Sequence, residues 1–85
     1  MSKYKLIDGE FTVAEAKEII GNLLEYKIQF HSRQNFSHEI RNGHSDDQSL
    51  KRKLELTRTK ELFLEQMSGL DANQKLVINA DILID

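Results

Sequence analysis

Histidine and carboxylate side chains have the strongest capacity for chemistry in this chain, and their spacing decides what they can do together. His31 and His38 are seven residues apart, which on a helix separates them by about 10.5 Å, too far to share one metal ion. No histidine is followed four residues later by a His, Asp or Glu. His44 with Asp46 and Asp47 is a weak grouping, because zinc sites normally need three or four converging ligands. We therefore expect no metal site and no cofactor.

Serine hydroxyls and paired carboxylates are the other candidates for catalysis. None of the six serines stands in a glycine-rich elbow, and the chain has no cysteine. The only adjacent carboxylates, Asp46 and Asp47, lie where a helix is predicted to begin, and helix capping explains them. The four glycines are scattered, so no phosphate-binding loop is predicted. We expect that the protein is not an enzyme.

A run of cations in the second half of the chain has the charge to contact phosphates. This basic collar consists of Lys51, Arg52, Lys53, Arg58 and Lys60. On a helical wheel Lys51 and Arg58 share one side, whereas Lys53 and Lys60 share nearly the opposite side, so the cations surround the helix. Nucleic-acid-binding surfaces are usually basic on one face and carry aromatic residues that stack on bases, and no aromatic lies among these cations. Nucleic-acid binding is therefore the second hypothesis.

An apolar pair in polar surroundings is the remaining candidate site. Exposed aromatic residues are enriched at interface cores, so Phe36 with its neighbours could dock a protein partner. The candidate docking residues are Phe36, His38, Ile40 and Arg41. The alternative, which we favour, is a local tether that folds this segment onto Leu50 and Leu54.

Two helices and two strands are predicted to position these residues. The predicted elements are a strand over residues 3–7, a helix over 12–34, a connector over 35–45, a helix over 46–68 and a strand over 76–84. Alternation of apolar residues predicts the strands. A capping box of Thr12 and Glu15 begins the first helix, and Gly69 ends the second. A first helix that reached Gly43 would be about 12 Å longer than its partner, so we expect its regular part to end earlier.

The order strand, helix, helix, strand makes the two strands antiparallel if each junction is a simple reversal. The predicted fold class is α+β, a single domain over residues 1–85. It is an antiparallel helical hairpin that is closed at its base by a two-stranded antiparallel sheet.

The apolar residues of the first helix between Val13 and Phe30 cover about 200° of its circumference, whereas one packing partner needs a stripe somewhat over about 100° wide. A two-stranded sheet is also marginal in water and has two free edges. A symmetric dimer would relieve both problems. The candidate dimer interface is Ile20, Leu24, Ile28, Phe63 and Met67. We expect a homodimeric protein–protein interaction or adaptor module, paired near the sheet and free to meet a protein partner at the tip of the hairpin.

Composition sets the remaining limits. The formal net charge of −2 indicates no particular partner. No segment approaches the roughly 18 apolar residues of a membrane span, and the N-terminus lacks the pattern of a signal peptide. We therefore expect a cytoplasmic protein that makes no contact with a membrane.

Overall fold

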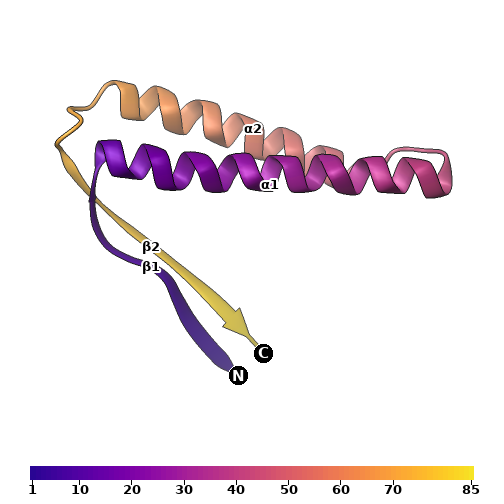
Figure 1. Ribbon diagram of the computed structural model, residues 1–85, viewed down its shortest axis with the longest axis horizontal. Helices are drawn as coiled ribbons and strands as arrows, with labels where there is room; N and C mark the ends of the chain where they lie inside the picture. The colour runs from indigo at the N-terminus through magenta and orange to yellow at the C-terminus, as the bar shows by residue number, and fades with distance from the viewer.

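The computed structural model describes all 85 residues and places them in the predicted order of elements (Figure 1). Strand β1 spans Ser2–Thr12, helix α1 spans Val13–Asn42, helix α2 spans Asp47–Ser68 and strand β2 spans Lys75–Ile84. The two strands pair antiparallel in a two-stranded sheet. The predicted α+β hairpin is therefore confirmed. Neither helix is long and apolar enough to cross a membrane.

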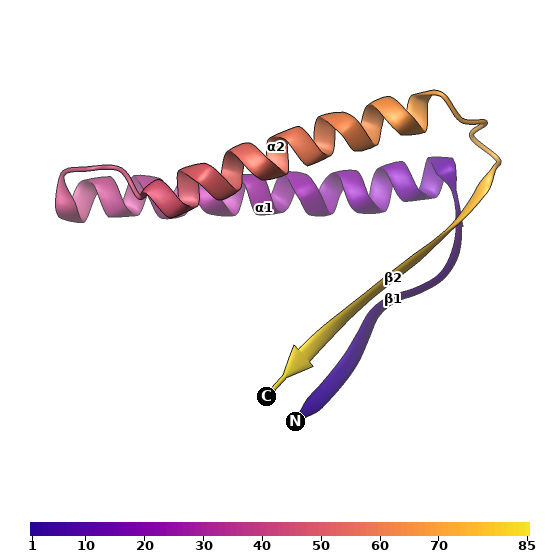
Figure 2. The ribbon, with the colours of Figure 1, turned by 180° about the vertical axis from the view of Figure 1, so that it is seen from behind.

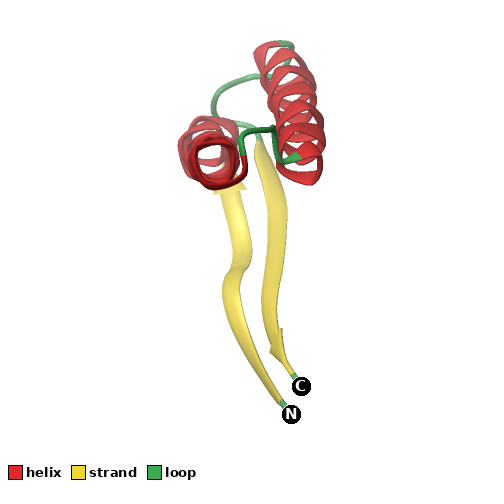
Figure 3. Ribbon diagram, turned by 90° about the vertical axis from the view of Figure 1, so that its right-hand side faces the viewer, coloured by secondary structure: helices red, strands yellow, loops and turns green.

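The molecule has an open shape. The sheet leaves the base of the hairpin at an angle to the helices and does not fold flat against them (Figures 1 and 2). Seen along α1, both strands extend to one side of the hairpin (Figure 3). The chain measures 48 × 36 × 14 Å and has a radius of gyration of 15.9 Å, whereas a compact domain of this length is expected to have one of about 12 Å.

The start of α1 is fixed by the capping box that the sequence predicts. The Thr12 amide donates to Glu15 Oε1 (2.9 Å), and the Glu15 amide donates to Thr12 Oγ1 (3.1 Å). The amide of Val13 has no partner within the helix and donates to the Gln74 carbonyl (2.8 Å). The bond from Val13 joins the start of α1 to the loop that leads into β2.

The connector predicted over residues 35–45 is wrong, because α1 continues without a break to Asn42. It ends at Gly43, which has a φ of 75° in the left-handed region that favours glycine. The excess length of α1 is accommodated by the chain after Gly43, which runs back along the last turns of the helix before α2 begins (Figure 1). The start of α2 therefore lies beside Asn35, as the hydrogen bond between Asn35 and Asp46 requires.

Hydrogen bonds from α1 to this returning segment explain why the helix stays regular here. They are Asp46 N–H to Asn35 Oδ1 (2.7 Å), His38 Nδ1 to the His44 carbonyl (2.9 Å) and Ser45 Oγ to Glu39 Oε1 (3.1 Å). Each needs a side chain from one face of a continuous α1. The polar residues of this segment suggest a loop when only the sequence is considered. In the structure they are helical, and they bind the loop that follows the helix.

Helix α2 packs on α1 through a row with alternating spacings of four and three residues. The buried or half-buried members of this row are Ser49, Lys53, Leu56, Lys60, Phe63 and Met67. Two of its polar members have partners on α1: Ser49 Oγ lies 3.2 Å from Gln34 Oε1, and Lys60 Nζ lies 2.7 Å from Glu25 Oε2. The helical interface is therefore apolar toward the base and polar toward the tip.

One face of the sheet is apolar. Its cross-strand pairs are Tyr4 with Ile82, Ile7 with Ala80, Gly9 with Ile78 and Phe11 with Leu76. Tyr4 and Ile7 are an odd number of residues apart and would project from opposite faces of a regular strand. A register shift between Lys5 and Ile7 leaves Leu6 as a bulge and brings both onto the apolar face.

Strand β1 is longer than the predicted 3–7, because its backbone pairing with β2 continues through Asp8, Gly9 and Glu10 despite their low strand propensity. The apolar face is half-buried near the hairpin, at the pair of Phe11 and Leu76. This face of the sheet is therefore turned toward the helices.

A pair of glycine substitutions tests the end of α1. Gly43→Ala is expected to lower the free energy of unfolding by about 1 kcal/mol, because the backbone of a residue with a Cβ must then adopt the left-handed conformation. Gly21→Ala is the matched control within α1. An added Cβ there meets nothing within 4 Å, so the free energy of unfolding is expected to rise by up to about 1 kcal/mol. Denaturant unfolding at one fixed protein concentration measures both, and effects of equal sign would contradict the assigned helix end.

Candidate functional site

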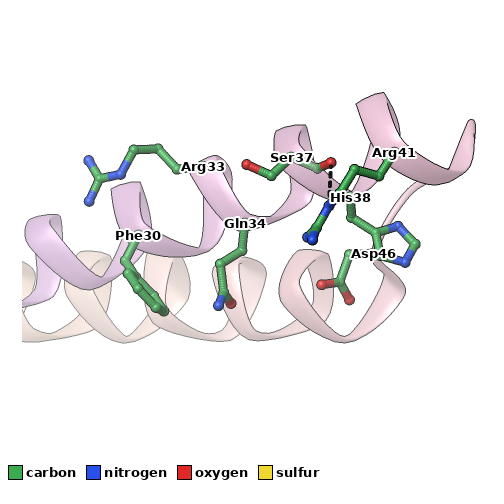
Figure 4. A pocket seen from close by; sticks show the side chains of 7 residues that line it. All are labelled: Phe30, Arg33, Gln34, Ser37, His38, Arg41 and Asp46. Carbon is green, nitrogen blue, oxygen red and sulfur yellow. Dashed lines mark hydrogen bonds between the residues drawn. The ribbon is translucent and has the colours of Figure 1, made fainter.

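A hollow of about 290 Å³ lies near the tip of the hairpin, where the end of α1 passes the start of α2 (Figure 4). It is lined by Phe30, Arg33, Gln34, Ser37, His38, Arg41 and Asp46. Gln34 and His38 point from α1 toward α2, whereas Arg33 points away (Figure 4). The hollow thus brings together two of the candidate docking residues, His38 and Arg41.

Four polar side chains of this hollow already have hydrogen-bond partners, namely Gln34, His38, Arg41 and Asp46. Asp46 caps α2, and its carboxylate accepts from the Ser49 amide (3.2 Å) and hydroxyl (3.0 Å). The hydrogen bond from the Ser49 amide lowers the pKa of Asp46, and nearby His38 contributes in the same direction. Arg41 Nε donates to the Ser37 carbonyl (3.4 Å). This carboxylate therefore stabilises the helix start, and the arrangement does not supply a free base beside a nucleophile.

The remaining candidate docking residues form a separate apolar surface on the last turns of α1. Phe36 is 63% exposed and Ile40 is 68% exposed. The predicted tether onto Leu50 and Leu54 is wrong for Leu54, because Leu54 is exposed as well as Phe36, and the segment that carries Phe36 is a continuous part of α1. His38 is engaged by the His44 carbonyl. The exposed tip surface therefore consists of Phe36, Ile40 and Arg41.

The basic collar is largely paired with carboxylates. Ion pairs join Arg52 to Glu55 (3.1 Å), Arg58 to Glu61 (3.5 Å) and Lys60 to Glu25 (2.7 Å). The hydrogen bond from Lys60 lowers the pKa of Glu25. Lys51 and Lys53 are the members without such a pair, so a continuous basic face does not form on α2. Nucleic-acid binding stays a prediction that no contact in the structure favours.

The candidate dimer interface needs correction. Leu24 and Met67 are buried within the single chain, where they hold α1 against α2. Their assignment to a dimer interface is wrong, because a folded protomer does not present them. Ile20, Ile28 and Phe63 are half-buried along the same packing surface.

A second apolar row of α1 is the surface that a folded protomer does present. This α1 stripe consists of Ile19, Leu23, Tyr26 and Phe30, which follow a spacing of four, three and four residues and are all exposed. The apolar arc in the sequence contains the stripe. The neighbouring row that faces α2 has a similar period, so periodicity alone cannot show which row stays uncovered.

The far end of the sheet is also apolar and uncovered. Ile82 and Ile84 are about half exposed, and Tyr4 and Leu6 are exposed beside them. We call these four residues the sheet end. The open shape has two arms, which are the helical hairpin and the sheet (Figure 1). The α1 stripe lies on the first arm and the sheet end on the second.

The structure contains no group of three His, Asp or Glu side chains that could hold a metal ion. His44 with Asp46 and Asp47 does not form a cluster, because Asp46 is turned to the amide of Ser49 and His44 Nδ1 to the carbonyl of Ser45.

The carboxylate of Asp46 makes the stability of the hairpin depend on pH. Because its pKa is lower in the folded state, its contribution is complete above its unfolded pKa of about 3.9 and is lost as the pH falls through its folded value. Asp46→Asn, which keeps an accepting oxygen but cannot titrate, is expected to flatten the loss of stability below about pH 5. Unfolding followed from pH 7 to pH 3 measures this. An acid limb as steep as that of the wild type would contradict this role of Asp46.

Comparison of the chain with protein-family models, curated proteins and solved structures finds no match. A proposal for the function therefore rests on the surfaces described above.

Proposed function

We propose that this protein is a small non-enzymatic interaction module that acts as a homodimer and serves as an adaptor for another protein. The observation that carries the proposal is the imbalance between covered and uncovered apolar residues. Five apolar residues are buried, whereas fifteen large apolar residues are exposed. A soluble monomer rarely leaves contiguous apolar surface of this extent open, because such patches mark interaction sites.

The exposed area supports a second copy as the first partner. The chain exposes 6510 Å², whereas a folded monomer of 9.9 kDa is expected to expose about 5,200 Å². The excess of about 1,300 Å² per chain corresponds to about 2,600 Å² for a symmetric pair, which lies in the range of obligate homodimers. The excess thus matches what a stable dimer needs.

The charge distribution along α1 supports an antiparallel arrangement of the two α1 stripes. Residues 13–26 have a formal charge of −2, and residues 27–42 have a formal charge of +2. Antiparallel pairing of two copies across the α1 stripe places each acidic half beside a basic half. Complementary charge of this kind favours one orientation over the other.

The tip surface supports the adaptor role. Phe36 and Ile40 lie one turn apart near the end of α1, with Arg41 beside them and the sheet at the opposite end of the helix (Figure 1). A dimer that forms through the α1 stripe and the sheet end leaves this tip open. An exposed aromatic residue with an adjacent arginine is the composition of an interface core.

Sedimentation equilibrium of the full chain tests the dimer. We expect a mass of two chains at micromolar concentration. Leu23→Glu is expected to raise the dissociation constant at least tenfold, because it removes an apolar contact and buries a charge. Leu54→Glu is the matched control on the outer side of α2 and is expected to leave the dissociation constant unchanged. A wild-type chain that stays monomeric would overturn the proposal.

A further inference from the structure

The two edges of the sheet differ in their protection against a further strand. Strand β1 has the bulge at Leu6 and lysines at positions 3 and 5, which are features that hinder pairing between edges. Strand β2 has an unbroken register from Lys75 to Ala80 and no charged residue from Leu76 to Ala80. No other element lies beside its outer edge (Figure 3). Its outward backbone N–H and C=O groups are therefore open to a partner strand.

We infer that β2 pairs antiparallel with β2 of a second copy, which gives a four-stranded sheet with the two β2 strands at its centre. The inference rests on the homodimer proposed above and names a surface through which it forms. In a two-fold symmetric antiparallel pair, opposite residues lie on the same face of the sheet, so the register is centred on one residue. The side chains of β2 favour Ala80 as that residue.

A register centred on Ala80 gives complementary pairs along β2 and at Asp85, the residue that follows it. On the outer face Lys75 lies opposite Asp85 of the second copy, and Val77 lies opposite Leu83. On the apolar face the pairs are Leu76 with Ile84 and Ile78 with Ile82. Val77 and Leu83 are 64% and 72% exposed on an otherwise polar face, and nothing within one chain explains them. In this register they cover each other.

The neighbouring symmetric registers are worse. Centring on Asn79 places Lys75 opposite Leu83 and Val77 opposite Asp81. Centring on Asp81 places this carboxylate opposite itself, and like charges directly opposite are destabilising. The register on Ala80 is therefore selected by charge and by apolar pairing together.

The two-fold axis of this pair runs perpendicular to the sheet, so both helical hairpins lie on its apolar face and rise from its opposite ends. In each copy α2 is the helix on the β2 side of the hairpin (Figure 3), so the α2 helices lie nearer the axis than the α1 helices.

A charge exchange tests the register. Lys75→Glu places a glutamate opposite Asp85 at two symmetric positions, and Asp85→Lys places two lysines opposite Lys75. Each single change is expected to raise the dimer dissociation constant about five- to thirtyfold at low salt, and the double variant is expected to return it to within about threefold of the wild type. Residues 75 and 85 are about 34 Å apart within one chain. Rescue by the double variant can therefore arise only between chains.

The contacts of Lys75 inside the chain give the control for this exchange. The hydrogen bond from the Thr12 amide is the main cause of the lowered pKa of Glu15, and the charge of Lys75 contributes in the same direction, so Lys75→Glu also disturbs its own protomer. Asp85→Lys has no such neighbour, and an equal loss of affinity in this variant assigns the effect to the dimer. Additive losses in the double variant would overturn the register.

Cysteine cross-linking gives an independent test, because the chain has no cysteine of its own. Under mild oxidation Ala80→Cys is expected to form a disulfide-linked dimer, since directly opposite Cβ atoms of adjacent strands lie close enough. Asp8→Cys, exposed on β1, is the control and is expected to stay unlinked. A dimeric wild type whose Ala80→Cys variant does not link would overturn only the pairing of β2, whereas a monomeric wild type would overturn the homodimer itself.

Discussion

Apolar area that one chain cannot cover is the constraint on which the rest of this structure depends. A small core runs from the base of the hairpin to its middle, where Val13, Ala16 and Leu56 are nearly or fully inaccessible. Away from this core the sheet and the helices diverge, and no further element fills the space between the two arms. At about 25 cal/mol for each Å² of apolar surface removed from water, the open shape forgoes an amount of stabilisation that is large for a marginally stable domain.

Polar contacts hold the other end of the molecule. Toward the tip the helices meet through Gln34 and Ser49, and the returning segment is fastened by Asn35, His38 and Glu39. These bonds fix the geometry of the hairpin but bury little apolar surface. Exposed hydrogen bonds and ion pairs contribute modestly to net stability. The tip is therefore well defined in shape, whereas the strength of the fold must come from the base and from what covers it.

Local chemistry made the element order and the helix starts predictable. The capping box at Thr12 and the alternation of β2 depend on nearest neighbours in the chain, and both are confirmed. The end of α1 was not predictable, because the residues that indicate a loop around Asn35 act as hydrogen-bond partners of the segment beyond Gly43. The bulge at Leu6 was not predictable either, because it depends on residues far away in the chain. Only the pairing with β2 shows that Tyr4 and Ile7 share a face.

The candidate surfaces show the limit of periodicity. The wide apolar arc of α1 predicts two covering directions, of which α2 supplies one, and two adjacent rows of the arc have a spacing that suits contact with α2. The row that contains Leu24 packs against α2, and Leu23 and the other residues of the α1 stripe stay exposed. Which row stays uncovered depends on tertiary geometry that the sequence of one helix does not encode. The same holds for the collar, where Glu25 of α1 neutralises Lys60 of α2 across the hairpin.

The central claim is that the fold of one chain is completed by another, and the dependence of thermal stability on protein concentration tests it most directly. If folding and association are coupled, a hundredfold increase in concentration raises the unfolding midpoint by several degrees, because the dimer is favoured by mass action. A midpoint that stays constant over the same range, with reversible two-state unfolding, would mean that a single chain is stable as it stands and would contradict the account.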